Sequence, residues 1–322
     1  MWRDIKWSVL LVIVTSISCS LFSSEEPTPE IPGKLVYSAP DKNGRYQIYT
    51  SLTNGAKRKQ LTSSGDEEAE FFNPAWNSDG TQIALTSTLN SSTEGPSLYL
   101  MNSDGSNLRP LKGRSNTDIV TTGNNPKWSP DDSKIAFDSC LNCELGGRNH
   151  ELFVYDFETD IITQLTDTVS SDFYPEWKNN EELYFISDRD YYLIDSLRTN
   201  EDIYIVRIPK ISESRITYTG KIGSLSLNRI NNSILIRPES GDEDWYFLDI
   251  STSDSTFFEF PSNISRTFTS AVTWSKNGEW ILFKVGGLRA GRLFTFYNTE
   301  TKVTLQFNSE PFKDAGMDWY TE

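Results

Sequence analysis

The chain has 322 residues, 37% of them hydrophobic and 13% aromatic, so it can bury one large core or two ordinary ones. Its formal net charge is −15. The phosphates of nucleic acid would be repelled by such a chain, because no basic stripe offsets its acidity. Acidity also keeps proteins soluble, so the charge excludes nucleic acid without naming another partner.

Residues 1–18 predict a signal peptide. Arg3 and Lys6 precede an apolar run over 7–17 that is too short to cross a bilayer comfortably. The run ends in Thr-Ser-Ile-Ser-Cys, which resembles the end of a bacterial lipoprotein signal with cleavage before Cys19. The resemblance implies that Cys19 is lipidated. A plain secretory signal and an uncleaved anchor are the alternatives.

Residues 19–33 are rich in Ser, Glu and Pro and contain little that can pack. This composition predicts a flexible tether between the lipid anchor and a folded domain over 34–322. Ser20 is compatible with sorting to the bacterial outer membrane. The sequence leaves open whether the anchored protein faces the periplasm or the cell surface.

The folded part contains a sequence motif that recurs roughly every 50 residues. "NPAWNSDGTQIALTS" over 73–87 returns as "NPKWSPDDSKIAFDS" over 125–139. In each unit a strand ending in Trp is followed by a turn of Asn, Asp, Gly, Ser or Pro, and then by strands with alternating apolar residues. The repeat length and the four strands predict the blades of a β-propeller.

The two ends of the repeat region predict how many blades there are. Before the first Trp lies a partial unit of three strands over 34–62, and a lone Trp strand, "GMDWYT", lies near the C-terminus. Five full units separate them, one of them degenerate with Leu227 at the Trp position. The predicted fold is an all-β, six-bladed propeller of four-stranded blades, in which the C-terminal strand completes the first blade and no sheet edge stays open.

The recurring Trp predicts packing between blades, because a ring at the same place in each unit buries a large apolar area. A role for any of them as a ligand platform is the alternative. The residues concerned are Trp76, Trp128, Trp177, Trp274 and Trp319.

These units resemble the propeller repeats of the TolB family, most clearly in "PKWSPD" over 126–131 and in Asp202-Ile203-Tyr204. The resemblance implies a propeller that docks other proteins of the cell envelope. TolB is soluble and carries an α/β domain before its propeller, whereas this chain has a tether and a lipidation signal. The resemblance therefore implies a docking role for this chain, but it does not imply a part in the Tol–Pal system.

Few residues offer catalytic or metal chemistry. His150 is the single histidine, and without a Gly-x-Ser-x-Gly motif it is interpreted as a surface loop residue. Cys140 and Cys143 predict a local disulfide in an oxidising compartment. Free thiols, a redox pair and a metal site with His150 and Glu144 are the alternatives.

The loop over 187–202 is rich in carboxylates, which could hold Ca²⁺ through oxygen ligands. The calcium candidates are Asp188, Asp190 and Asp202. The spacing is not that of an EF-hand, so solvated loop charge is the competing interpretation. No other cofactor is expected.

The sequence therefore predicts a lipid-anchored, non-catalytic scaffold that binds an envelope protein or a glycan. The expected contact surfaces are the variable loops over 88–96, 112–124, 138–150 and 188–202, because a rigid scaffold tolerates loop variation. An enzyme that cleaves saccharide polymers with paired carboxylates is the main alternative. A sensor or lid domain of a larger envelope complex is a third hypothesis.

Overall fold

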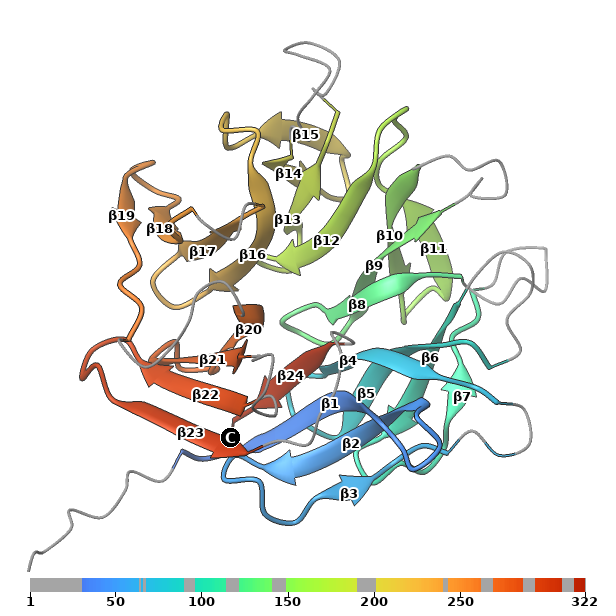
Figure 1. Ribbon diagram of the computed structural model, residues 1–322. Coiled ribbons are helices and arrows are strands. Elements are labelled where there is room, and N and C mark those ends of the chain that lie inside the picture. Colours follow the sequence, from blue (N-terminus) through green and yellow to red (C-terminus); the bar gives the residue numbers. More distant parts are fainter. Residues whose placement is uncertain are drawn as a thin grey trace, which may run out of the picture. The chain divides into compact units, whose positions relative to one another are not determined.

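The computed structural model contains six antiparallel sheets of four strands each, which form a ring within residues 32–322 (Figure 1). It describes residues 31–322 except for 64, 66–67, 90–95, 114–121, 141–148, 190–200, 240–242, 262–268, 286–292, 309–315 and 322. The predicted six-bladed propeller is confirmed. The signal peptide, Cys19 and most of the tether lie outside the described residues.

The strands follow one another from the centre of the ring outward in every blade. Blade 1 consists of β24 (Met317–Tyr320), β1 (Lys34–Pro40), β2 (Tyr46–Leu52) and β3 (Lys59–Gln60). Blade 2 consists of β4 (Phe71–Trp76), β5 (Gln82–Ser87), β6 (Ser97–Asn102) and β7 (Arg109–Pro110). Blade 3 consists of β8 (Asn124–Trp128), β9 (Lys134–Cys140), β10 (His150–Asp156) and β11 (Ile161–Gln164).

Blades 4 to 6 repeat this order. Blade 4 consists of β12 (Asp172–Trp177), β13 (Glu182–Ser187), β14 (Asp202–Arg207) and β15 (Ser212–Arg215). Blade 5 consists of β16 (Ile222–Asn228), β17 (Ser233–Pro238), β18 (Tyr246–Asp249) and β19 (Ser255–Phe257). Blade 6 consists of β20 (Thr269–Trp274), β21 (Trp280–Val285), β22 (Leu293–Asn298) and β23 (Thr304–Asn308).

The C-terminal strand closes the ring as the sequence predicted. β24 pairs antiparallel with β1 from Lys34↔Tyr320 to Tyr37↔Met317, and it packs against β20 and β4 of the neighbouring blades. The Asp318 carboxylate accepts hydrogen bonds from the backbone N–H of Trp76 at 2.8 Å and of Trp319 at 2.8 Å. One side chain of the closing strand thus joins blade 1 to blade 2.

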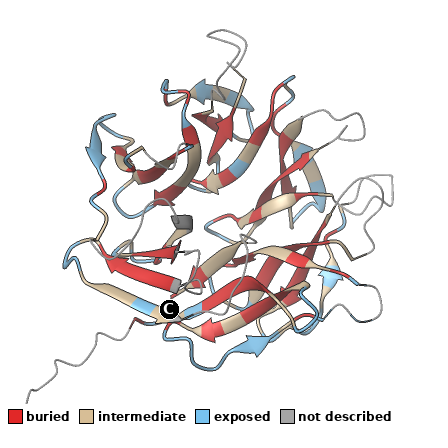
Figure 2. Ribbon diagram, in the orientation of Figure 1, coloured by how far each residue is buried: buried red, intermediate tan, exposed pale blue. Residues whose placement is uncertain are grey.

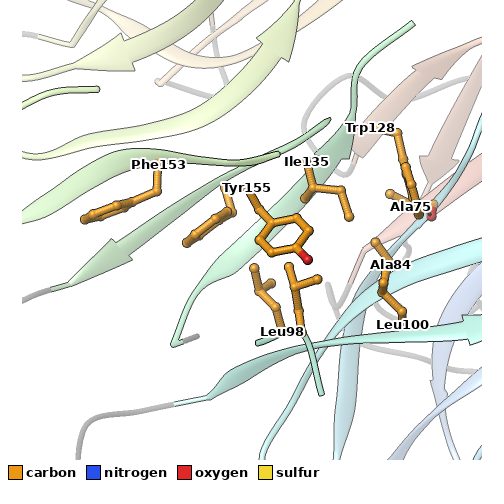
Figure 3. Packing of buried hydrophobic residues seen from close by; sticks show 10 residues of the cluster. Ala75, Ala84, Leu98, Leu100, Trp128, Ile135, Phe153 and Tyr155 are labelled. Atoms are coloured by element: carbon orange, nitrogen blue, oxygen red, sulfur yellow. Dashed lines mark hydrogen bonds between the residues drawn. The ribbon is translucent and has the colours of Figure 1, made fainter. Parts of the chain in front are cut away.

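Apolar side chains fill the space between adjacent blades. Figure 3 shows the interface of blades 2 and 3, where Trp128, Ile135 and Tyr155 pack against Ala75, Ala84, Leu98 and Leu100. All five repeated Trp side chains are buried. Burial falls off toward the outside of the ring, where the fourth strand of a blade is largely exposed (Figure 2). Consecutive residues of the second and third strands are buried, so these strands pack on both faces of the sheet, and the outer edge of the blade does not.

Some of the indole N–H groups also link the blades. Trp128 Nε1 donates to the Ala75 carbonyl at 3.2 Å, and Trp177 Nε1 donates to the Lys127 carbonyl at 2.9 Å. In each case the acceptor is the residue before the Trp position of the preceding blade. Blade 5 has Leu227 there, and Arg229 Nε donates instead to the Trp177 carbonyl at 2.7 Å. The degenerate repeat thus keeps a link between blades by another side chain.

The ring has two distinct faces. The turns after the Trp strands lie on one face, which we call the lower face, and they bond to each other: Ser78 N donates to the Asp132 carboxylate at 2.8 Å. First strands begin, and second strands end, at the opposite, upper face. Third strands begin at this upper face too, as at Ser97 and Asp202. Short tight turns therefore hold the lower face together.

Candidate functional site

A cavity of about 930 Å³ lies at the centre of the ring. Its walls come mainly from the innermost strands β4, β8, β12, β16, β20 and β24, with Asp138, His150 and Arg237 added from the upper ends of β9, β10 and β17. Such a volume is in the range of ligand pockets in proteins. The innermost strands bulge at this level in blades 2 to 6, where the register with the second strand shifts.

The residue just before the Trp position points into this cavity in several blades. In blades 3 and 4 these residues form an ion pair, with Lys127 Nζ and Glu176 Oε1 2.7 Å apart. Arg229 adds a second, longer contact to Glu176 at 3.9 Å. Asp318 occupies the same position in blade 1 and also lines the cavity.

These charges change one another's pKa. Burial alone would lower the pKa of Lys127, but the carboxylates of Glu176 and Asp318 together raise it above its ordinary value. Burial raises the pKa of Asp318, and the nearby Lys127 and the two backbone N–H donors oppose the rise only in part. Lys127 therefore remains a cation in the cavity across the physiological range of pH.

A second polar cluster lies where the cavity meets the upper face. His150 Nδ1 is 3.2 Å from Asp138 Oδ2, and Asn125 Nδ2 donates to Asp138 Oδ1 at 2.8 Å. The Asp138 carboxylate is almost fully buried. Its hydrogen bond to the imidazole is the main reason that the pKa of His150 is raised. His150 begins β10 and lines the cavity, so its interpretation as a surface loop residue was wrong.

A third group of polar side chains surrounds the same opening from blades 4 and 5. Arg237 Nε donates to Ser224 Oγ at 3.1 Å, and its Nη2 donates to the Gly223 carbonyl at 3.2 Å. Asp188 accepts a hydrogen bond from Ser171 N at 2.7 Å. These contacts hold both side chains against the rim, so the polar groups around the opening are positioned by the fold itself.

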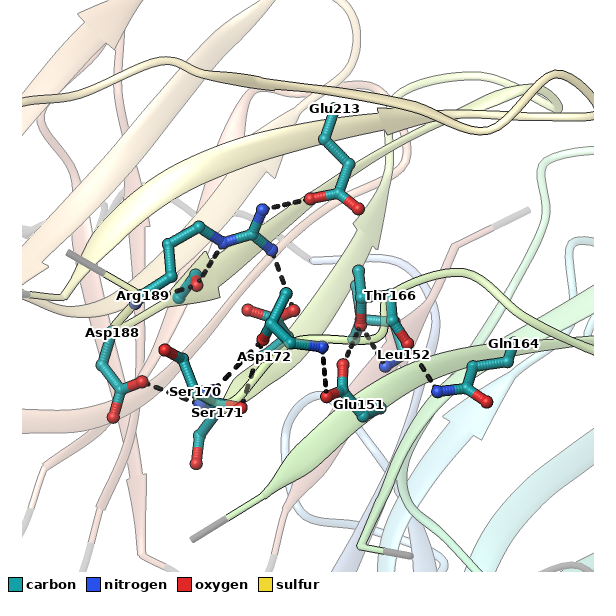
Figure 4. A network of polar contacts seen from close by, with 12 residues as sticks. Glu151, Leu152, Gln164, Thr166, Ser170, Ser171, Asp172, Asp188, Arg189 and Glu213 are labelled. Carbon is teal, nitrogen blue, oxygen red and sulfur yellow. Dashed lines mark hydrogen bonds and ion pairs between the residues drawn. The ribbon is translucent and has the colours of Figure 1, made fainter.

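Behind this rim lies a buried ionic network between blades 3 and 4 (Figure 4). Arg189 Nη2 donates to the fully buried Asp172 at 2.9 Å, and its Nη1 pairs with Glu213. Glu151 accepts a hydrogen bond from Thr166 at 2.6 Å. Burial raises the pKa of both Asp172 and Glu151. The network holds in place the strand ends that flank residues 190–200 in the sequence, so its role is structural.

The calcium candidates are not assembled into a site by the residues that the structure describes. Asp202 begins β14, and its carboxylate accepts hydrogen bonds from Thr217 Oγ1 at 2.6 Å and Thr219 N at 2.9 Å and pairs with Arg215 at 2.6 Å. Asp188 lies on the rim, and Asp190 is outside the described residues. Within the described ranges no three His, Cys, Asp or Glu side chains are placed to hold a metal ion.

The Asp202 contacts explain part of the repeat. Thr217 Oγ1 also accepts a hydrogen bond from Ile203 N, at 2.9 Å. Blade 3 has the same arrangement with Glu151 and Thr166, and blade 1 has it with Gln47 and Thr62. A polar residue at the first or second position of the third strand therefore holds the segment that follows the fourth strand. This gives the Asp of the Asp-Ile-Tyr motif a structural role.

Other predicted residues fall at the edge of what the structure describes. Cys140 ends β9 and is disulfide-bonded. Cys143, its expected partner, lies outside the described residues, as does Glu144, so the pairing stays a prediction. Most of the four predicted contact loops also lie outside them. The described residues include no helix that is long and apolar enough to cross a membrane.

Sequence reasoning missed the charged residues of the cavity. Lys127, Glu176 and Asp318 each stand directly before a repeated Trp. Successive side chains of a strand point to opposite faces of the sheet, so the residue before each Trp points away from the interface that the Trp fills, and in an innermost strand it can border the central cavity. That position in the repeat could have identified all three.

No protein-family model matches the chain, and no curated protein matches it either. Solved structures do resemble it. TolB from Acinetobacter baumannii has a TM-score of 0.69 at 19% identity, over 91% of this chain and 68% of that one. Hydrazine synthase from Kuenenia stuttgartiensis has a TM-score of 0.61 at 13% identity, over 90% of this chain and 46% of that one. A puromycin-hydrolysing peptidase from Mycobacterium tuberculosis has a TM-score of 0.56 at 15% identity, over 86% and 44%.

These likenesses concern the fold alone. They confirm the predicted similarity to the propeller of TolB at that level. The chain spans less than half of the length of the hydrazine synthase and of the peptidase. Because the three include proteins named as enzymes, a shared propeller does not decide between catalysis and binding.

Proposed function

We propose that this protein is a non-catalytic binding scaffold of the bacterial cell envelope, which holds a protein or glycan ligand at the upper mouth of its central cavity. The observation that carries the proposal is the set of polar side chains fixed around that mouth: Asp138 with His150, and Arg237 with Ser224. Groups that are already positioned lose little conformational entropy when a ligand binds, which favours recognition. The ring of blades supplies the rigid frame.

Two carboxylates of the cavity, Glu176 and Asp318, favour binding over catalysis. A general acid or base must exchange its proton with the substrate, so it needs an oxygen that is open to the substrate. Glu176 is paired with Lys127 and contacts Arg229, and both oxygens of Asp318 accept backbone hydrogen bonds. These contacts engage the carboxylate oxygens of Glu176 and Asp318 in holding the fold together, which leaves them poorly placed to exchange protons with a substrate.

The test compares the two faces of the propeller. A photo-reactive amino acid at Asn124, on the cavity wall, is expected to cross-link one reproducible envelope component in intact cells. The same group at Ser253, in a lower-face turn, should not. Arg237→Ala should abolish the Asn124 cross-link and leave the melting temperature within a few degrees. Equal labelling from both faces would contradict a ligand site at the upper mouth.

A saccharide-cleaving enzyme is the second candidate, favoured by one observation. Asp318 and Glu176 lie at the same level of one cavity on either side of Lys127, and burial raises the pKa of Asp318. Glycoside hydrolysis uses two carboxyl groups at one site, and a raised pKa suits one of them to act as the acid. Release of reducing ends from envelope polysaccharides, lost in both Glu176→Gln and Asp318→Asn, would support this candidate and overturn the first.

Anchoring to the membrane belongs to the same proposal. Lipidation of Cys19 would place the propeller at the outer membrane through the tether over 19–33. The variant Cys19→Ala is expected to move the protein from the membrane fraction to the soluble fraction. An unchanged distribution would contradict the lipid anchor without touching the binding site.

A further inference from the structure

Blade 4 carries an unexpected residue at the bulge of its innermost strand. In blades 1 to 3 the backbone has a positive φ three residues before the repeated Trp: 86° at Gly316, 47° at Asn73 and 51° at Asn125. Asn and Gly tolerate this left-handed conformation. In blade 4 the residue is Tyr174, with a φ of 56°. A bulky side chain in this conformation strains the backbone, so the reason for a tyrosine here must lie in its side chain.

The Tyr174 side chain is not used to fill the core. It is 45% exposed and lines the central cavity, with Phe173 packed edge-on at a centroid distance of 5.1 Å. A ring that served packing alone would be buried like the repeated Trp side chains. Tyr174 instead presents aromatic surface to whatever enters from the upper face.

The charged groups around the Tyr174 ring determine whether a cationic or an anionic ligand is attracted. The described cavity walls contain the carboxyl groups of Asp138, Glu176, Asp188, Glu201, Glu239 and Asp318, against the cations Lys127 and Arg237 and the titratable His150. Negative groups remain in excess even with His150 charged and Asp318 protonated. The Asp138 carboxylate accepts a hydrogen bond from Tyr174 N at 3.4 Å. An anionic ligand would be repelled, and a cation would be drawn in.

We propose that Tyr174 and the carboxylates beside it bind a basic side chain, the ammonium of Lys or the guanidinium of Arg, from an exposed segment of a partner polypeptide. A cation over the face of a tyrosine is attracted by the ring, and a nearby carboxylate adds to the attraction. The inference rests on the proposed function, because it identifies the chemistry of a ligand at the same mouth. The acidic chain as a whole would steer such a partner toward it.

The experiment measures fluorescence anisotropy of a labelled Gly-spaced tri-lysine peptide, its tri-arginine equivalent and a tri-glutamate control with the full-length protein. Both basic peptides should bind and the acidic one should not. Binding should weaken as salt rises from low to physiological concentration. Tyr174→Asn, which installs the residue of blades 2 and 3, should weaken binding roughly tenfold and leave the melting temperature equal or higher. Tyr174→Phe keeps the ring and should stay within about twofold of the natural protein.

Several results would overturn this proposal. They are equal binding of the acidic peptide, unchanged affinity in Tyr174→Asn, or a fall in melting temperature of Tyr174→Asn with affinity intact, which would assign the ring to packing. Binding of free spermidine but of neither peptide would show an amine site without a polypeptide partner. Neutral oligosaccharide binding that Arg237→Ala abolishes and Tyr174→Asn does not would refute this inference and leave the binding function standing.

Discussion

Removal of one side chain from the closing strand should destabilise the whole propeller. Trp319 is 5% exposed, packs edge-on against Phe296 at 5.0 Å, and donates from Nε1 to the Pro32 carbonyl at 3.3 Å. Truncating a buried Trp to Ala usually costs about 3–5 kcal/mol, and the lost hydrogen bond accounts for about 1 kcal/mol of this range. That is a large share of the roughly 5–15 kcal/mol by which a folded protein is stable.

The assay for Trp319→Ala is guanidinium unfolding followed by far-UV circular dichroism, with the midpoint as the readout. Trp319→Phe is the matched control. It keeps an aromatic ring against Phe296 but loses the indole N–H, so a loss of about 1–2 kcal/mol is expected. A loss below about 1 kcal/mol in Trp319→Ala would refute the idea that closure by β24 holds the ring together. Equal losses in the two variants would assign the effect to the hydrogen bond.

Three further predictions concern the charged groups. His150 is the single histidine, so one imidazole signal in an NMR titration reports its raised pKa directly. The contribution of its charged form to the free energy of unfolding should be complete below about pH 6.5 and should be lost as pH rises through the folded pKa. Asp138→Asn should remove this contribution. Glu176→Gln leaves Lys127 without its carboxylate and should cost about 1–3 kcal/mol in denaturant unfolding, whereas a stability gain would contradict the ion pair. Asp202→Ala should cost about 3 kcal/mol because it strips four partners, and a calcium chelator should leave the melting temperature of the natural protein unchanged.

The sequence by itself determined the architecture of the propeller. Alternation of apolar residues and the turn after each Trp are local signals, so each strand can be predicted from its own residues without reference to the rest of the chain. The repeat length then predicts the four-stranded blade, and the unmatched strand that contains Trp319 predicts the closure of the ring. A prediction built on local rules repeated six times is robust, because one weak copy, such as that with Leu227, does not change the count.

Only the tertiary structure decided which side chains meet. Lys127 and Glu176 are about 50 residues apart and come together because adjacent blades turn the same strand position toward one axis. His150 looked like a loop residue until the upper ends of β9 and β10 placed it beside Asp138. Local patterns say which way a side chain points in its own sheet. The curvature of the ring sets what it faces, and it depends on the packing of every blade at once.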